Sequence, residues 1–361
     1  MSELYIGIMS GTSLDGIDIA LCEIKSDSFE LLHWAEHPFD KELKVDILTA
    51  IEGEITLKKL GKLDTRLGHL YANAINSFIL TKKIDKKTIS AIGLHGQTLW
   101  HEPNGEHPFS MQLGNASLIT AQTGVSVVSD FRQKDIALGG QGAPFAPAFH
   151  QYIFSRLKAN TAVLNIGGMA NLTILGEKLT GYDTGCGNVF MDFWISQKKA
   201  LTYDKDGEWG SSGEVSDELL KLTLLDPYFS LAPPKSTGRE YFSTKWLDEK
   251  LQNFKTLKDE DIQATLLELT AISCANEVKK SSTNLLIVCG GGVKNTHLMK
   301  RLQEKLNGVK VVTSDECGVS SEFMEAMAFA WLAYKRIHKE SINISSVTGA
   351  SEDSILGALY E

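Results

Sequence analysis

One aspartate is placed where a general base would be useful. Asp183 lies in the segment from Gly181 to Asn188, in which glycine-rich turn residues follow a short strand and precede a predicted helix. A carboxylate held in such a turn, facing a cleft, is suited to take a proton from water. The same position also suits an aspartate that only closes an Asx turn or caps the helix. The residues alone leave both roles open.

Glu325 and Arg132 form a second pair of candidates. Glu325 is the lone charged residue in the apolar run from Phe323 to Trp331. An acidic group that enters a buried helix needs a partner, which predicts either an ion pair or a bound polar ligand. Arg132 is a candidate for that partner, and its planar guanidinium would equally suit an anionic substrate. A purely structural salt bridge is the alternative.

Glycine-rich turns that directly follow apolar strands predict phosphate binding. Glycine lets backbone N–H groups approach an anion and point at it. Each turn alone is also compatible with an ordinary hairpin, but their corresponding places in two halves of the chain favour the phosphate function. Asp15 or Asp18 is placed to hold Mg²⁺ through water, because this ion tends to keep its hydration shell; no direct metal ligand is predicted. The turns are Gly11 to Gly16, Gly167 with Gly168, and Gly290, Gly291 and Gly292.

Two other nucleotide-binding motifs are excluded. A P-loop requires Gly-Lys followed by Ser or Thr, whereas the Gly61-Lys62 pair is followed by Leu63. The Rossmann fingerprint requires a third glycine, and Asn295 stands in its place after the last glycine turn.

The elements that must position these residues recur in two halves, each with a hairpin, a helix, a strand and a further helix. Alternating or continuous apolar runs predict the strands, and an apolar stripe at helical spacing predicts the helix around residues 67–79. The other predicted helices cover 261–280 and 321–334. The predicted strands are 4–9, 17–24, 29–37, 89–94, 161–166, 171–175, 285–288 and 309–313.

Composition limits the partners and the compartment. The 361 residues carry 36 Lys+Arg against 45 Asp+Glu, a net charge of −9, which argues against binding to nucleic acid or an anionic membrane. Apolar residues make up 43% of the chain, as in globular proteins. The 5 cysteines are dispersed, which favours a reducing, cytoplasmic location over a disulfide framework. A homodimer is the expected assembly, because it is the commonest one.

Taken together, the motifs resemble the 1,6-anhydro-N-acetylmuramic acid kinase family, within the superfamily of sugar kinases, heat-shock chaperones and actin. The resemblance extends over nearly the whole chain, and the first and fifth motifs below are its most specific parts. In chain order the motifs are Met9 to Asp18, His95 to Thr98, Asp130 to Arg132, Asn165 to Asn171, Tyr182 to Asn188 and Cys289 to Asn295.

The resemblance implies a fold class: α/β, with two actin-like (ribonuclease-H-like) domains that have mixed sheets flanked by helices. Domain I is expected to comprise residues 1–135 with 350–361, and domain II residues 136–349. The active site is expected in the cleft between them, and the Gly- and Pro-rich stretch 139–147 is the candidate linker.

The resemblance also implies roles for individual residues. Asp183 is the expected catalytic base. The family usually has proline where Cys186 stands, and since proline would stiffen the turn, the stiffness of this loop is open while the role of Asp183 is not. The residues expected at ATP are Gly11, Thr12, Ser13, Leu14, Asp15, Gly16, Ile17, Asp18, Gly167, Gly168, Gly290, Gly291 and Gly292. Those expected at the sugar are Thr98, Arg132 and Glu325, with His95 and Gln97 close by.

The implied reaction joins hydrolysis to phosphoryl transfer. Water opens the 1,6-anhydro bridge of the amino sugar, and the freed O6 takes the γ-phosphoryl group of ATP, with Mg²⁺ as cofactor. The products are N-acetylmuramic acid 6-phosphate and ADP, in the recycling of peptidoglycan in the bacterial cytoplasm. Two alternatives stay open: another sugar or carboxylate kinase of the superfamily, or a nucleotide-dependent binding module like actin or the chaperones.

Overall fold

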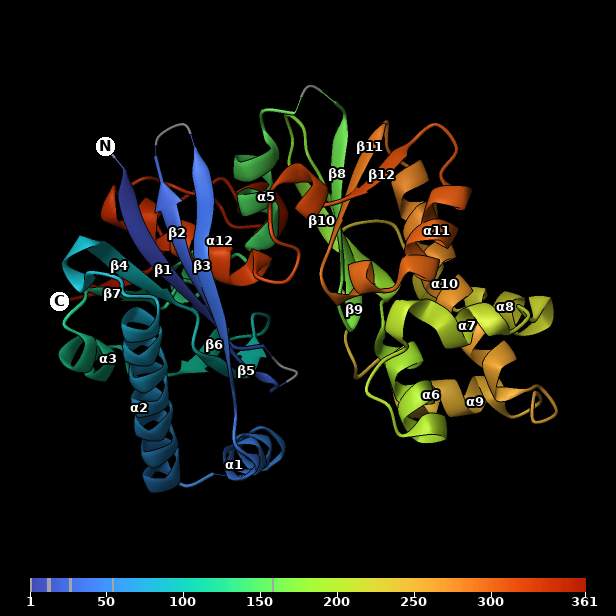
Figure 1. Cartoon of the computed structure of the whole chain (residues 1–361), viewed down its shortest axis with the longest axis horizontal. Coiled ribbons are helices and arrows are strands. Elements are labelled where there is room, and N and C mark those ends of the chain that lie inside the picture. Colours follow the sequence, from blue (N-terminus) through green and yellow to red (C-terminus); the bar gives the residue numbers. More distant parts are fainter. Residues whose placement is uncertain (1, 12–13, 26–27, 54, 158) are drawn as a thin grey trace. The chain divides into compact units, whose positions relative to one another are not determined.

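The chain divides into two compact units (Figure 1). The computed structural model describes residues 2–11, 14–25, 28–53, 55–157 and 159–361. Unit 1 consists of Met1–Phe149 together with Phe323–Glu361, and unit 2 consists of His150–Glu322. Helix α5 (Ala146–Phe154) contains the boundary between them.

These boundaries differ from the predicted ones, chiefly because of helix α12 (Met324–Ile337). The sequence had placed this helix in the second domain, but it packs against the sheet of unit 1. Two glycines of that sheet permit the close approach. A Cβ added to Gly7 would overlap the carbonyl oxygen of Ala326, and one added to Gly93 would overlap that of Phe329. The whole stretch predicted as a linker, 139–147, also lies inside unit 1, where the Asp135 carboxylate accepts the N–H of Gly142.

Unit 1 is built on a mixed sheet with the strand order β13-β7-β4-β1-β2-β3. Strands β1, β2 and β3 form an antiparallel meander, while β4 and β7 run parallel to β1. A separate hairpin, β5 with β6, follows β4. The strands are β1 (Glu3–Met9), β2 (Gly16–Ile24), β3 (Phe29–Pro38), β4 (Ile89–Leu94), β5 (Gln97–Glu102), β6 (Phe109–Leu113), β7 (Val127–Ser129) and β13 (Ala358–Tyr360). The other helices are α1 (Lys41–Glu52), α2 (Leu57–Thr81), α3 (Ala116–Thr123), α4 (Gln133–Ala137) and α13 (Ser345–Thr348).

Unit 2 repeats this topology, with the order β10-β9-β8-β11-β12. Its first three strands are again an antiparallel meander, and the next two are parallel to the first. The shared order confirms the predicted fold class of two actin-like units with mixed sheets. The strands are β8 (Thr161–Ile166), β9 (Met169–Ile174), β10 (Thr180–Cys186), β11 (Leu285–Cys289) and β12 (Lys310–Thr313). The helices are α6 (Val189–Lys199), α7 (Glu208–Ser212), α8 (Asp217–Leu224), α9 (Thr244–Leu251), α10 (Asp259–Lys279) and α11 (Thr296–Lys305).

Alternation along β1 shows how unit 1 buries both faces of its sheet. Ile6 and Ile8 belong to the core cluster that also contains the apolar stripe of α2. Tyr5, one residue out of phase, instead meets Tyr334 of α12 edge-on, with ring centroids 5.7 Å apart. Successive residues of a strand point to opposite faces, so α2 and α12 lie on opposite sides of the sheet.

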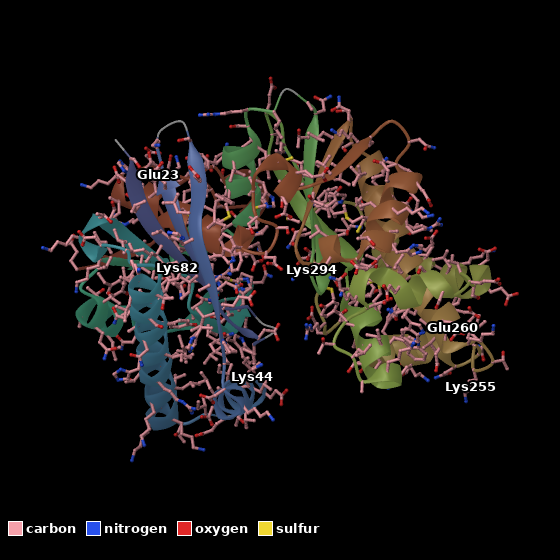
Figure 2. All side chains as sticks on the ribbon, in the orientation of Figure 1. Glu23, Lys44, Lys82, Lys255, Glu260 and Lys294 are labelled. Atoms are coloured by element: carbon pink, nitrogen blue, oxygen red, sulfur yellow. The ribbon has the colours of Figure 1, made fainter. Side chains whose placement is uncertain are left out.

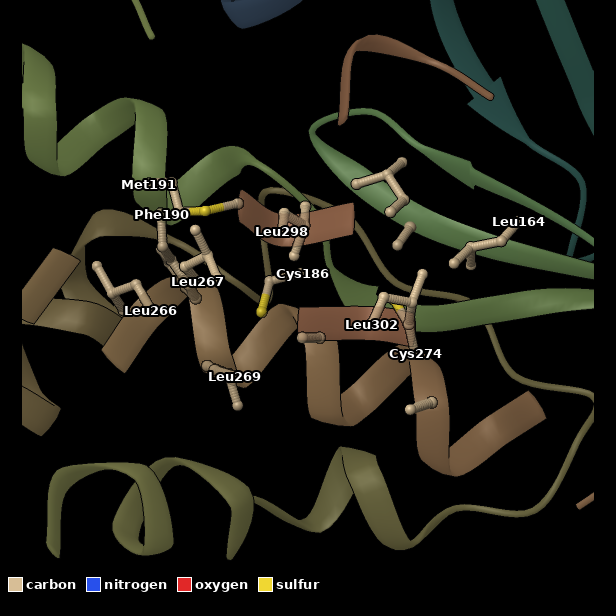
Figure 3. Close-up of a cluster of buried hydrophobic side chains, with 14 of the residues drawn as sticks. Leu164, Cys186, Phe190, Met191, Leu266, Leu267, Leu269, Cys274, Leu298 and Leu302 are labelled. Carbon is tan, nitrogen blue, oxygen red and sulfur yellow. The ribbon is translucent and has the colours of Figure 1, made fainter. Parts of the chain in front are cut away.

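The core of unit 2 lies between its sheet and helices α6, α10 and α11 (Figure 3). Leu164 of β8, Phe190 of α6 and Leu302 of α11 are among its buried side chains. Cys186, which stands where the family usually has proline, is 1% exposed within this cluster. Burial raises the pKa of the Cys186 thiol, so it contributes packing rather than a reactive thiolate.

A helix that crosses a bilayer must be long and apolar. Within the described ranges, none of the helices combines the length and the apolar character that crossing a bilayer requires.

Candidate active site

Asp183 lies in β10 and is held by one neighbouring segment. Its backbone N–H donates to the carbonyl of Lys235 (3.1 Å). Its carboxylate oxygen Oδ2 accepts two hydrogen bonds, from the backbone N–H of Thr237 (2.9 Å) and from the hydroxyl of Ser236 (3.1 Å). The carboxylate is therefore oriented by the segment 235–237, and it does not cap helix α6.

The surroundings of Asp183 make it a stronger base than an ordinary aspartate. Burial raises the pKa of Asp183 above its ordinary value, and the hydrogen bonds from Thr237 and Ser236 oppose that rise. Both donors reach Oδ2, so among the described residues Oδ1 has no hydrogen-bond donor. The side chain is partly exposed. Oδ1 is thus available to a water molecule or a hydroxyl group.

The segment that holds Asp183 was missed by the sequence analysis. Ser236 and Thr237 follow Lys235, whose Nζ is buried and pairs with Glu277 of α10 at 2.7 Å. The available signal was the composition of the stretch from Pro233 to Gly238, where proline and glycine frame three residues with polar side chains. Such a stretch indicates a structured turn, but it does not indicate which acid the turn holds.

In unit 2 the predicted phosphate turn and the turn that follows Asp183 meet each other. The backbone N–H groups of Gly187 and Val189 donate to the carbonyl of Gly168 (2.9 and 3.1 Å), and that of Asn188 donates to Gly167 (2.7 Å). A Cβ on Gly187 would overlap the carbonyl oxygen of Gly167. The turn after β8 is therefore fixed against the start of α6.

The third glycine turn joins the same cluster. A Cβ on Gly290 would overlap Oδ1 of Asn165, and one on Gly292 would lie 2.5 Å from Cβ of Ile166. The helix η4 (Gly291–Lys294) follows, ending at Lys294, which is labelled in Figure 2 and pairs with Glu322. Gly291 is exposed. Unit 2 thus brings Gly167, Gly168 and the turn 290–292 together, as phosphate and nucleotide binding requires.

In unit 1 the turn after β1 lies next to the segment 95–98. The hydroxyl of Ser10 donates to the carbonyl of Gly96 (3.2 Å), and the amide of Gln97 donates to the carbonyl of Gly11 (3.4 Å). Leu14 adopts a φ of 59°, a left-handed conformation that is unusual for leucine and typical of strained functional turns. Predicted phosphate and sugar residues of unit 1 are therefore neighbours.

Two further residues of this turn, Thr12 and Ser13, lie outside the described residues. Gly16 and Ile17 begin β2, in which Gly16 pairs with Pro38. The side chain of Asp15 is exposed and that of Asp18 partly buried. In the described part of the chain, no three His, Cys, Asp or Glu side chains gather closely enough to hold a metal ion.

Arg132 is held between a histidine and a backbone carbonyl. Its guanidinium donates to the carbonyl of Gly142 (2.7 Å) and to Nε2 of His95 (2.8 Å), and it lies 5.2 Å from the centre of the Phe145 ring. Burial lowers the pKa of His95 to about 3, so the imidazole is neutral. Because a guanidinium can only donate, Nε2 accepts and the ring proton resides on Nδ1. Among the described residues, the buried Nε of Arg132 has no acceptor.

Glu325 differs from the prediction. It occupies the first turn of α12, where its side chain is exposed, whereas the helix is buried all round from Ala326 to Tyr334. Desolvation by the surrounding protein nevertheless raises the pKa of Glu325, and the charge of Arg132 opposes that rise. The two groups interact through space, and the buried carboxylate predicted from the helix pattern is not found.

Thr98 lies at the start of the β5–β6 hairpin. Its hydroxyl accepts a hydrogen bond from the amide of Gln112 (3.2 Å) on β6. The hairpin therefore fixes Thr98 beside Gln97, as the common sugar-facing role predicted for them requires.

Fold and site together define a class of protein. Two mixed-sheet units share one strand order, and each carries a glycine turn after its first strand, which is the actin-like class. A family model described as anhydro-N-acetylmuramic acid kinase matches residues 3–361. The chain therefore belongs to the anhydro-N-acetylmuramic acid kinase family.

Individual relatives match the chain from end to end. It is 64% identical over 368 residues to an anhydro-N-acetylmuramic acid kinase of Sulfurimonas denitrificans, with 100% of both chains covered. It is 54% identical over 359 residues to one of Sulfurovum sp., with 99% of both covered. Among solved structures, it is similar to the activator of the 2-hydroxyisocaproyl-CoA dehydratase of Clostridium difficile, with a TM-score of 0.46 and 11% identity over 93% of this chain and 96% of that one.

Proposed function

We propose that this protein is an ATP-dependent kinase that opens the 1,6-anhydro bridge of 1,6-anhydro-N-acetylmuramic acid with water and phosphorylates O6. The products are N-acetylmuramic acid 6-phosphate and ADP, and the reaction belongs to peptidoglycan recycling. Membership of the family supports the reaction class. The observation that carries the mechanism is the free Oδ1 of Asp183, a carboxylate oriented through its other oxygen.

Asp183 acts as the general base. Oδ1 takes a proton from a water molecule as that water attacks C1 of the sugar. The bridging bond from C1 to O6 breaks, and O6 leaves with the electron pair. A bicyclic anhydro sugar has no free O6, so this cleavage must precede or accompany phosphoryl transfer. A positioned base typically contributes about 10²–10⁴-fold in rate.

The freed O6 then attacks the γ-phosphorus of ATP, and ADP leaves. Backbone N–H groups of the glycine turns stabilise the charge that develops on the phosphoryl oxygens. The exposed Asp15 and the partly buried Asp18 offer the carboxylate oxygens that Mg²⁺ prefers, and they would hold the ion through its waters. When bound, Mg²⁺ neutralises part of the phosphate charge.

Arg132 binds the lactyl carboxylate of the sugar. The guanidinium is already fixed by Gly142 and His95, and its unpaired Nε leaves it a donor for an anion. Thr98, Gln97 and Glu325 are the further sugar-facing residues of unit 1. The proposed base belongs to unit 2 and these residues to unit 1, and an active site in a cleft between the domains stays a prediction.

A cellular location and an oligomeric state are proposed together with the function. The described cysteines are free, and four of the five are buried, which supports a reducing, cytoplasmic location. The homodimer stays a prediction.

Isotope labelling tests the reaction. The protein is incubated with the anhydro sugar, ATP, Mg²⁺ and ¹⁸O-water, and the product is analysed by mass spectrometry. We expect one ¹⁸O at C1 and phosphate on O6. A phosphorylated sugar without the label would contradict hydrolytic opening, and hydrolysis of ATP without any sugar product would favour a binding module. A panel of other sugars and carboxylates is the control for substrate class.

A further inference from the structure

The segment that orients the base continues to the predicted phosphate turn. Lys235 anchors its start through the buried ion pair with Glu277, and the next two residues bind the Asp183 carboxylate. Two residues after Thr237 comes Arg239, which neither the sequence motifs nor the proposed mechanism uses. One short stretch of chain therefore spans the distance between the base and this arginine.

The guanidinium of Arg239 lies over the turn after β8. A Cβ built on Gly168 would be 3.5 Å from one terminal nitrogen of Arg239 and 3.8 Å from its Nε. The Arg239 guanidinium therefore lies on the side of Gly168 where a side chain would project. Gly168 is only partly exposed, and its carbonyl is already occupied by the N–H groups of Gly187 and Val189. The arginine is thus placed beside the backbone expected to bind phosphate.

The guanidinium of Arg239 is not held in place by the described residues. Within the described residues it forms no ion pair or hydrogen bond, and its side chain is exposed. Asp192 of α6 senses the charge of Arg239: burial raises the pKa of Asp192 to about 6, and Arg239 opposes the rise. The interaction acts through space only. A solvent-accessible guanidinium without a partner, beside an anion-binding turn, is available for a ligand.

We propose that Arg239 is a phosphate-binding residue that contacts the terminal phosphates of a nucleoside di- or triphosphate at the Gly167–Gly168 turn. Its planar fork binds two phosphate oxygens at once. Because the segment 235–239 also orients Asp183, phosphate binding at one end and base positioning at the other depend on the same stretch of chain. The proposal rests on the proposed function for the identity of the nucleotide, but not for the existence of the anion site.

The test is the binding of ADP to the whole protein, measured by calorimetry without sugar. Arg239→Ala is expected to weaken ADP binding about 10- to 100-fold, the loss typical of a charge-assisted contact. Arg239→Gln, which keeps most of the side-chain length, is expected to match it. It serves as the second variant if the alanine form does not fold. The control is Arg156→Ala, an exposed arginine elsewhere in unit 2, which is expected to bind ADP as the wild type does.

The outcomes separate this proposal from the proposed function. ADP binding by folded Arg239→Ala or Arg239→Gln within twofold of the wild type overturns the proposal. A marked loss in these variants, with Arg156→Ala unchanged, supports it. If the wild type binds ADP in this Arg239-dependent way yet yields no phosphorylated sugar, the proposed function fails and the phosphate site stands. A steady-state KM that rises for ATP and not for the sugar adds an independent readout.

Discussion

The two units are built on the same sheet and carry different parts of the chemistry. Each has a meander of three strands followed by two parallel strands, and each has a glycine turn after its first strand. In unit 2 the connection from β10 to β11 contains α6 to α10 and the segment that orients Asp183. In the described part of unit 1 the equivalent connection, from β3 to β4, is shorter and contains α1, α2 and the short helix η1 (Lys86–Thr88). The unit with the long connection holds Asp183, the proposed base.

Unit 1 instead places its functional residues after the fourth strand. His95, Gln97 and Thr98 follow β4, and Arg132 follows β7. The comparison teaches that one topology leaves two places free for variation. In the proposed function, additions between the third and fourth strands carry the proton transfer, and loops after the fourth and fifth strands carry the anion recognition. Substitutions in each place should therefore affect different kinetic constants.

The largest expected effect is in unit 2. Asp183→Asn keeps the shape of the side chain and removes the base, so kcat should fall about 10²–10⁴-fold while ADP binding stays as in the wild type. Steady-state kinetics and calorimetry measure the two quantities. Asp248→Asn, on the exposed side of α9, is the matched control. Near-normal turnover by Asp183→Asn would remove unit 2 as the source of proton transfer.

In unit 1 we expect a smaller effect, on the KM for the sugar rather than on kcat. Arg132→Lys cannot reach Gly142, His95 and the substrate together, because lysine lacks the planar fork. The KM for the sugar should rise about 10- to 100-fold, with a lesser change in kcat. Arg336→Lys, whose guanidinium donates to the carbonyl of Gly357, is the control in the same unit. An unchanged KM for Arg132→Lys would contradict anion recognition by unit 1.

The free energy of unfolding tests whether a glycine of unit 1 is needed for packing rather than for the reaction. Gly7→Ala inserts a methyl group between β1 and α12 and should lower the free energy of unfolding by about 1–3 kcal/mol. Gly61→Ala, in the same unit, meets open space inside helix α2 and should instead stabilise by about 0.5–1 kcal/mol. Denaturant titration measures both. Equal effects of the two substitutions would show that α12 does not need the close approach.

The smallest effect is a shift in pH dependence. The Ser236 hydroxyl stabilises the ionised form of Asp183, so Ser236→Ala should raise the pKa of Asp183 further. The base is active when deprotonated, hence the acidic limb of kcat/KM should move to higher pH while activity on the alkaline plateau changes little. Ser155→Ala, at an exposed site away from β10, is the control. If the acidic limb of kcat/KM does not shift, Ser236 does not hydrogen-bond to the deprotonated Asp183 that acts as base.

Local patterns were sufficient to predict most of the elements. Alternation predicted β1, β2 and β8 closely, and the stripe from Leu67 to Ile79 lies inside α2. Asn295 caps α11 by accepting the N–H of Leu298 at 2.9 Å, a contact between residues three apart. These features depend on residues that are near one another in the sequence, so they can be predicted from it.

Features that depend on distant residues were missed. The pattern of α12 predicts a helix but not which sheet it covers; unit 1 includes this helix, whereas the expected domain II included it. The same limit explains Glu325, whose exposure depends on the direction in which α12 meets the sheet. Ser236 and Thr237 hold Asp183 from more than 50 positions away. The site residues identified through family motifs stay predictions until tested in the ways above.

The return of α12 to the first sheet has a consequence for biosynthesis. While a ribosome makes the chain, the face of β1 that carries Tyr5 and Gly7 stays uncovered until residues beyond Phe323 emerge. At the usual speed of translation, that delay after Phe149 is on the order of ten seconds or more. Unit 2, formed from one continuous stretch, is complete first. Nascent unit 1 therefore presents an apolar sheet surface during this interval, and it is the half of the molecule for which chaperone protection matters.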